Sequence, residues 1–433
     1  MRRVFEDYAY TDAVRNGCYW DSTVAQRSWP VLRGTHQADV VIIGAGFVGL
    51  NAAIELVQGG ASVIVVDAEF PGWGASGRNG GFCCMGGAKA EDATIARHYG
   101  PEALEAWDAA QVAAIDLVDQ RISDLALDVE RHSDGEIVLA HSARAMKRLA
   151  AENQTVFNAE ELRAMGIAGH GFHGGMRTPV GFGLNPRRYV DGLARHADSL
   201  GVSIYGQTPV TKLTKGANRW HAHTPEGWVE ADTVLIASNG YSSDDLPDWL
   251  TARYLPAQSS VMVTRPLSEA EQHAQGWTSD LMAYDTRTLL HYFRLMPNGR
   301  FLFGMRGGLS SSPRAEAATR RQMRQHFDRM FPAWTSVEAT HMWSGLVCLM
   351  PSLVPFVGEV PDMTGVFAAM GWHGNGVAMG SYAGVQIAAR MAGRPSNGLP
   401  DFVSYPPKRF PLNKNRRALL RLAYLGYAVK DVI

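Results

Sequence analysis

Several features that mark other classes of protein are scarce or missing in this chain of 433 residues. The longest apolar runs fall short of the roughly 20 residues that a membrane-spanning helix needs. Lysine and arginine number 41 against 42 acidic residues, so the chain has no excess of positive charge with which to attract nucleic acid. Acidic and aromatic residues, rather than the apolar core of a signal peptide, follow Met1, Arg2 and Arg3. We therefore expect a cytoplasmic protein.

Cysteine is also rare, with Cys18, Cys83, Cys84 and Cys348 as its four occurrences. Their spacing does not match that of metal ligands, so we expect no metal site and small buried thiols in a reducing compartment. The sequence contains neither Gly-x-Ser-x-Gly nor His-Glu-x-x-His, the motifs of serine hydrolases and zinc peptidases.

Residues 39–49 form the most informative motif, an apolar run that ends in Gly-x-Gly-x-x-Gly at Gly44, Gly46 and Gly49. Gly44 permits a tight turn, Gly46 lets a pyrophosphate approach the backbone, and Gly49 allows close packing of the following helix. The N–H groups at the start of that helix suit phosphates. A second apolar strand ends at Asp67, which we expect to bind ribose hydroxyls. The motif predicts a site for an adenine dinucleotide, either a nicotinamide cofactor or FAD.

The order of the predicted elements favours FAD. Stretches of α/β sequence alternate with β-rich stretches, whereas a nicotinamide dehydrogenase usually completes its dinucleotide-binding unit without such returns. The α/β stretches are 38–90, 184–250 and 341–400, and the β-rich stretches are 91–183 and 251–340. We expect an α/β fold in which a discontinuous, Rossmann-like FAD-binding domain of the glutathione-reductase type is interleaved with a β-rich antiparallel substrate-binding domain.

A lead-in at 1–37 and a basic helical tail at 401–433 flank these domains. Arginines alternate with leucines at 414–430. A basic amphipathic helix of this kind can associate with a membrane surface, but it more often packs its apolar side on its own domain, which we expect here.

A glycine-rich loop at 72–81 follows Asp67. Its small side chains would let the backbone surround a pyrophosphate and approach the flavin ring. We expect Ser76 and Arg78 to add phosphate contacts.

Within this loop, residues 75–81 (Ala-Ser-Gly-Arg-Asn-Gly-Gly) resemble the second flavin motif of the D-amino-acid-oxidase superfamily. The similarity is to its glycine oxidase and sarcosine oxidase-like branch, and more narrowly to the bacterial gamma-glutamylputrescine oxidase group. It covers nearly the whole chain, and its other segments are 19–20, 185–189, 238–241, 292–297, 302–306, 343–345, 355–358 and 371–377.

The resemblance implies a flavin site completed by 371–377, from which a helix would direct the positive end of its dipole at the flavin N1–C2=O edge. The group commonly has serine and then histidine where this chain has His373 and Asn375. Cys348 is out of register with the cysteine that binds flavin covalently in sarcosine oxidases. The histidine that does so in dimethylglycine oxidases has no counterpart after Gly81. We therefore expect non-covalent FAD.

The activity that the resemblance implies is oxidation of an amine or amino acid. A neutral amine transfers hydride to flavin N5, the imine is hydrolysed, and dioxygen is reduced to hydrogen peroxide. The expected substrate is a primary or secondary amine bearing a carboxylate, such as an N-substituted amino acid or a gamma-glutamylputrescine-like compound. Three alternatives remain open: a dehydrogenase that passes electrons to a quinone or partner protein, an NAD(P)H-dependent flavin monooxygenase, and a non-catalytic FAD-binding subunit.

Five side chains are candidates for the catalytic site. His373 is a candidate for a hydrogen bond to substrate or flavin, and a helix-capping histidine explains it equally well. Arg306 is a candidate for binding a carboxylate or for activating oxygen, or it is a surface arginine. Tyr292, Arg294 and Trp343 are candidate pocket walls, although core packing also accounts for them. The residues expected to bind FAD are Gly44, Ala45, Gly46, Phe47, Val48, Gly49, Asp67, Ala68, Ala75, Ser76, Arg78, Asn79, Gly80, Gly81, Val210, Ser238, Gly240, Gly371, His373, Gly374, Asn375, Gly376 and Val377.

Overall fold

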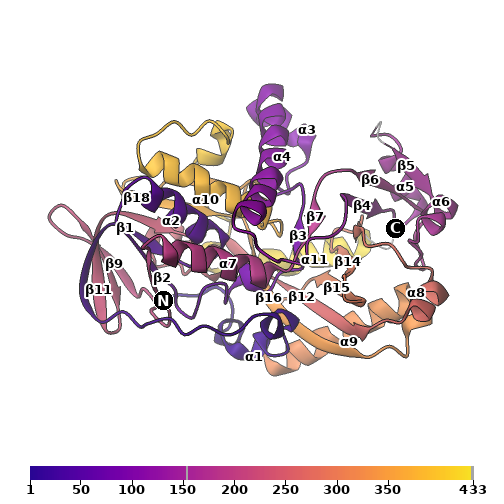
Figure 1. The fold of residues 1–433 in the computed structure, drawn as a ribbon. Helices are drawn as coiled ribbons and strands as arrows, with labels where there is room; N and C mark the ends of the chain where they lie inside the picture. The colour runs from indigo at the N-terminus through magenta and orange to yellow at the C-terminus, as the bar shows by residue number, and fades with distance from the viewer. Residues whose placement is uncertain (153–154, 431–433) are drawn as a thin grey trace.

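Within residues 1–152 and 155–430, which the computed structural model describes, the chain forms two eight-stranded sheets and one two-stranded sheet (Figure 1). The first sheet has the order β17-β18-β11-β1-β2-β8, and β9 and β10 extend it from β11. Its strands are β1 (Gly34–Ile43), β2 (Val63–Val66), β8 (Ser203–Tyr205), β9 (Lys212–Lys215), β10 (Trp220–Thr224), β11 (Gly227–Ile236), β17 (Phe356–Glu359) and β18 (Val366–Met370). The central strands from β18 to β8 are parallel, as expected for a dinucleotide-binding unit.

Helices cover one face of this parallel sheet, on the left of Figure 1. They are α2 (Phe47–Gln58), α4 (Pro101–Asp124), α7 (Pro186–Ser199) and α10 (Ala378–Met391). Asn185 caps α7 through its side-chain oxygen, which accepts from the N–H groups of Arg187 and Arg188, and Pro186 is the first helical residue, as the sequence predicts. Small residues bring α2 and α10 together, since a Cβ at Gly384 would lie 2.5 Å from the carbonyl oxygen of Val48.

The second sheet has the order β16-β12-β15-β14-β13-β4-β6-β5. Its strands are β4 (Glu136–Leu139), β5 (Val156–Asn158), β6 (Gly174–Thr178), β12 (Leu255–Pro266), β13 (Met282–Asp285), β14 (His291–Leu295), β15 (Arg300–Arg306) and β16 (Ala339–Leu349). The expected antiparallel pairing holds for every pair except β4–β13, which is parallel. The chain leaves β4 and passes through much of the first sheet before β13, so these neighbours are not joined by a hairpin.

Alternation along the strands gives the second sheet two different faces. Phe293, Phe301 and Phe303 pack in an aromatic core with α9 (Pro313–Met330). Tyr292 and Arg306 lie on the opposite face, because successive side chains of a strand point to opposite sides. The face opposite the aromatic core therefore supplies side chains to a cavity.

Two expected boundaries differ from the structure. The sequence places residues 341–349 in the FAD-binding domain, whereas they belong to β16, which pairs with β12 along nearly its whole length. The return to the first sheet begins at β17, at Phe356. The expected lead-in likewise ends earlier, because β1 begins at Gly34.

The tail packs on the body of the protein. Arg416, which is 1 % exposed, donates to both carboxylate oxygens of Asp244, at 3.0 and 2.6 Å. Leu420, in α11 (Arg417–Lys430), is buried against Leu255 and Ala257. No helix among the described residues is long and apolar enough to cross a membrane. Residues 431–433 of the predicted tail lie outside the described part of the chain.

The remaining elements are short. The helices are α1 (Asp12–Arg15), α3 (Asp92–Tyr99), α5 (Ala143–Leu149), α6 (Ala159–Ala164) and α8 (Glu269–Gln275), and the two-stranded sheet consists of β3 (Phe82–Cys83) and β7 (Phe182–Gly183). The 3₁₀ helices are η1 (Asp7–Tyr10), η2 (Tyr19–Thr23), η3 (Ala75–Gly77), η4 (Asn239–Tyr241), η5 (Asp248–Leu250), η6 (Pro332–Trp334), η7 (Asp401–Ser404) and η8 (Asn413–Asn415).

Candidate active site

A cavity of about 1410 Å³, including its open mouth, lies where β1, β2 and β11 end. This is the edge of an open parallel sheet at which ligands bind. The predicted residues that line it are Gly44, Gly46, Phe47, Val48, Asp67, Ala68, Ala75, Ser76, Asn79, Val210, Ser238, Gly374, Gly376 and Val377. A single cavity thus joins the glycine motif after β1 to the loop after β2 and to the start of α10.

The glycines of the first motif form a cradle that side chains would fill. Gly44 has a φ of +112°, and a Cβ there would lie 2.9 Å from the carbonyl oxygen of Ala237. A Cβ at Gly46 would lie 2.8 Å from Ser76 Oγ, and one at Gly49 would lie 2.0 Å from the carbonyl oxygen of Gly44. These close approaches fit the roles that the motif predicts, with bare backbone facing a pyrophosphate.

Asp67 lies at the end of β2 and faces the same cavity. Its carboxylate accepts hydrogen bonds from the N–H groups of Ala45 and Glu69, at 2.8 and 2.9 Å. Burial raises the pKa of this carboxyl above its usual value. Each oxygen keeps a further lone pair, so the carboxylate remains able to accept ribose hydroxyls.

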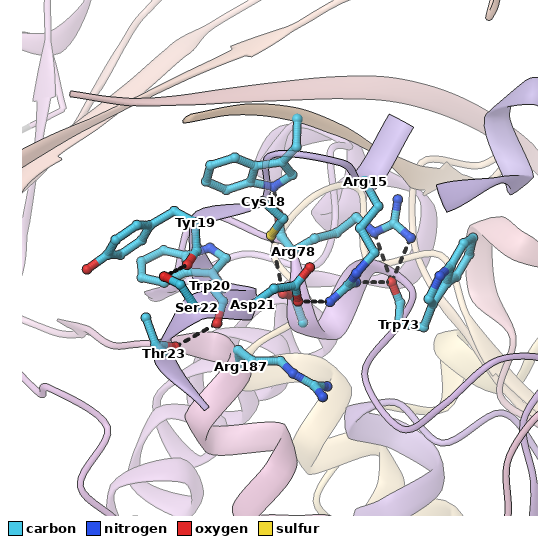
Figure 2. A network of polar contacts seen from close by, with 12 residues as sticks. Arg15, Cys18, Tyr19, Trp20, Asp21, Ser22, Thr23, Trp73, Arg78 and Arg187 are labelled. Carbon is cyan, nitrogen blue, oxygen red and sulfur yellow. Dashed lines mark hydrogen bonds and ion pairs between the residues drawn. The ribbon is translucent and has the colours of Figure 1, made fainter. Parts of the chain in front are cut away.

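The loop at 72–81 is held by donors that approach its carbonyl oxygens from outside (Figure 2). Arg78, expected to contact phosphate, instead donates from Nε and Nη2 to the carbonyl oxygen of Trp73, at 2.9 and 2.7 Å. Its Nη1 donates to the carbonyl oxygen of Ser344. The guanidinium does not make the expected phosphate contact because it turns into the protein. Arg78 as a whole is only 2 % exposed.

The lead-in supplies more of these donors, as Figure 2 shows. Arg15 donates to the carbonyl oxygen of Trp73 at 2.6 Å, and the indole N–H of Trp20 donates to that of Asn79 at 2.8 Å. From α7, Arg187 donates to the carbonyl oxygen of Pro71 at 2.5 Å. Because the C=O and the following N–H of a trans peptide point in opposite directions, the N–H groups of Gly74 and Gly80 point away from these clamping side chains.

A second cavity, of about 1200 Å³ with its mouth, adjoins the first on the face of the second sheet opposite the aromatic core. The two cavities share Ala75, Asn79, Val347, Gly374 and Val377 in their walls. The predicted residues that line the second cavity alone are Arg78, Gly80, Tyr292, Arg306, His373 and Asn375. The remaining residues expected to bind FAD, Ala45, Gly49, Gly81, Gly240 and Gly371, line neither cavity.

Both ring nitrogens of His373 form hydrogen bonds with backbone groups of the protein. Its Nε2 faces the backbone N–H of Met350 at 3.1 Å, which can only donate, and its Nδ1 faces the carbonyl oxygen of Gly87 at 2.9 Å. The ring is therefore neutral, with its proton on Nδ1. Burial lowers its pKa to about 4. Since both nitrogens are used, neither is left for the hydrogen bond to substrate or flavin that the sequence suggested.

Arg306 is the predicted residue best placed to meet a substrate. It ends β15, lies in the wall of the second cavity, and approaches Gly374, where a Cβ would lie 2.3 Å from Arg306 Nη2. Among the described residues, no side chain forms an ion pair or hydrogen bond with its guanidinium. Burial lowers its pKa. A partly buried cation without an acidic partner is suited to bind an anionic group of a ligand.

Tyr292 lines the same cavity, whereas Arg294 and Trp343 do not. The hydroxyl of Tyr292 lies 3.2 Å from Ser259 Oγ. Arg294, which is fully buried, donates to the carbonyl oxygens of Gly80 and Leu184, and burial lowers its pKa to about 9. Trp343 donates from its indole to the carbonyl oxygen of Arg78 at 2.7 Å. The latter two support the glycine-rich loop from behind and form no part of the pocket wall.

Sequence reasoning missed several residues of the second cavity, among them Glu136 on β4 and Tyr284 on β13. The available signal was a single acidic residue at the start of an apolar strand. All four cysteines are buried and unpaired, as expected, and Cys348 lines the first cavity.

Comparison with known proteins decides the family. The family described as FAD dependent oxidoreductase (DAO) matches residues 39–390. The chain belongs to this family. FAD is accordingly its cofactor, and the cradle after β1, Asp67 and the start of α10 are the parts of this structure that fit it.

Individual relatives match this chain over most of its length. The chain is 30 % identical over 430 residues to the probable oxidoreductase OrdL of Rhizobium meliloti, and the match covers 95 % of this chain and 97 % of that one. It is 25 % identical to the gamma-glutamylputrescine oxidoreductase of Escherichia coli, covering 91 % and 92 %. The crystal structure of glycine oxidase from Geobacillus kaustophilus has a similar fold, with a TM-score of 0.67 at 19 % identity, over 83 % of this chain and 96 % of that one.

Proposed function

We propose that this enzyme oxidises a primary or secondary amine that bears a carboxylate, with FAD bound non-covalently and dioxygen as electron acceptor. The unpartnered guanidinium of Arg306 in the second cavity carries the proposal. The names of the similar proteins, an oxidoreductase of gamma-glutamylputrescine and a glycine oxidase, support the same class of substrate.

Two features of the cavities support such a substrate. Arg306 would pair with the carboxylate, and the shared wall of the two cavities would hold the carbon–nitrogen bond beside the cofactor. FAD supplies the two-electron acceptor for this bond. Phe82, Val261 and Leu346 line the cavity with apolar surface, which excludes water and strengthens the pairing of the carboxylate with Arg306.

The α10 N-terminus adds an electrostatic contribution. Residues 374–377 form part of both cavity walls, and α10 begins immediately afterwards at Ala378. The N–H groups of its first turn carry positive partial charge, which favours negative charge that develops in the cofactor during reaction.

The test is an anaerobic screen of the FAD-loaded protein with N-methylglycine, other N-substituted amino acids and gamma-glutamylputrescine, followed by loss of flavin absorbance. Admission of air should restore the absorbance and produce hydrogen peroxide. Reduction by an amine without peroxide would instead identify a dehydrogenase, and bleaching by NADPH without amine would identify a monooxygenase. Failure of every amine would contradict the proposal.

Exchange of Arg306→Met tests the carboxylate contact. We expect KM for a carboxylate-bearing amine to rise about 10- to 100-fold, because a buried charged hydrogen bond contributes about 1.5–3 kcal/mol. The methyl ester of the same amine should be affected much less. Arg300→Met is the matched control, since Arg300 lies on the same strand but lines neither cavity. Equal losses for acid and ester would exclude the contact.

A further inference from the structure

Glu136 is a buried carboxylate in the wall of the second cavity that the proposed reaction does not use. It is the first residue of β4 and is 4 % exposed. Ile137 and Leu139 on the same strand pack in the aromatic core, so Glu136 lies on the opposite face, toward the cavity.

The partners of Glu136 do not satisfy its charge. Its Oε2 is buried and has no hydrogen-bond partner among the described residues. The Cys84 thiol hydrogen-bonds to this carboxyl and the Tyr284 ring lies near it, and neither group carries positive charge. Burial raises the pKa of this carboxyl to about 7. An unpaired buried acceptor is costly, and buried polar groups in native proteins usually have partners.

Glu136 is separated from Arg306 along the sheet. Val347, in the wall that the two cavities share, lies on β16 at the edge of the sheet. Arg306 lies two strands further on, and β14 and β13 separate its strand from β4. The register places Gly304 level with Val138, so Arg306 and Glu136 are offset by about four residues along the strands as well as by three spacings of about 4.8 Å, and their backbones are roughly 19 Å apart. The cavity therefore has a cation and a carboxylate at separate places in its wall.

We propose that Glu136 binds a positively charged nitrogen of the substrate that is not itself oxidised. The nitrogen that undergoes oxidation must be neutral, whereas a carboxylate such as Glu136 stabilises a nitrogen that carries positive charge. The substrate class is then narrower than carboxylate-bearing amines in general, because it carries a second amino group remote from the carboxylate. This inference rests on the proposed function for the identity of the pocket.

The test uses direct binding, so that it does not depend on turnover. The FAD-loaded protein is titrated by calorimetry at pH 8, where Glu136 is ionised, with 6-aminohexanoate and with hexanoate, which lacks only the amino group. We expect the wild type to bind 6-aminohexanoate more tightly by about 10- to 100-fold. In Glu136→Gln the preference should disappear while hexanoate binds as before, and Glu136→Asp should keep part of it.

Glu316→Gln is the matched control. Glu316 is a buried carboxylate too, but its oxygens accept from Ser344, and it lines neither cavity. This variant should retain the preference for 6-aminohexanoate. An unchanged preference in Glu136→Gln, or no preference in the wild type, would overturn the inference. Amine screening separates this failure from that of the proposed function, since oxidation of carboxylate-bearing amines would persist without a cation preference.

Discussion

His373 shows that a side chain in a cofactor motif can form hydrogen bonds with the protein's own backbone. Its backbone has a φ of +50°, which brings the ring of His373 back between Met350 and Gly87. A motif in the sequence places a residue near the cofactor, but it does not show which backbone groups compete for the ring. The same holds for Arg78, whose guanidinium binds carbonyl oxygens of the protein.

For His373→Leu we expect a loss of stability rather than of chemistry. At pH 7.5 the free energy of unfolding should fall by about 1–3 kcal/mol, because the Met350 N–H and the Gly87 carbonyl lose their partner. This difference should shrink as pH falls from about 6.5 to about 4, where the unfolded wild type takes up a proton that the folded ring does not. Urea unfolding at several pH values measures it. Unchanged stability with slower flavin reduction would assign His373 to the reaction instead.

Among the elements, α7 and the β14–β15 hairpin follow from local sequence. Asn185 and Pro186 define the start of α7, and the Pro-Asn-Gly turn at 297–299 joins β14 to β15. Local sequence does not predict the sheet to which β16 belongs, because the pairing of β16 with β12 depends on residues far away in the chain. The hydrogen bonds by which the lead-in clamps the 72–81 loop are not predicted by local sequence for the same reason, since they join residues far apart in the chain.

Exchange of Arg15→Leu tests this clamp. We expect the dissociation constant for FAD to rise about 10- to 100-fold, because the carbonyl oxygen of Trp73 loses a charged donor and the loop loses a support. Quenching of flavin fluorescence on titration of the apoprotein measures it. Arg27→Leu is the control, since Arg27 belongs to the same segment but pairs with Asp198 at the surface. A lower melting temperature with unchanged FAD affinity would show that Arg15 only stabilises the fold.

At the scale of the whole molecule, two cavities meet between two sheets, and segments from most of the chain form their walls. Binding of FAD should therefore couple these segments and stabilise the protein as one unit. At a free concentration 100 times its dissociation constant, FAD should add about 2.7 kcal/mol to the free energy of unfolding. Thermal unfolding of apoprotein and FAD-loaded protein gives this difference.

Denaturation with trichloroacetic acid tests the non-covalent attachment. We expect the flavin absorbance to remain in the supernatant after the protein precipitates. Flavin that stays with the precipitate would indicate a covalent bond, and Cys348, which lines the first cavity, would be the first residue to exchange.

The sequence by itself determined the cofactor and the α/β class. Glycine spacing, the acid after β2 and the helix start at Ala378 act through the local backbone, which short stretches of sequence specify. The tertiary structure decided which side chains line the second cavity. Strand register and packing turned Arg294 and Trp343 behind the loop, while Arg306 and Glu136 came to line one cavity from strands far apart in the chain. The sheet face on which a strand residue lies depends on the register with its partner strands, which the local sequence does not identify.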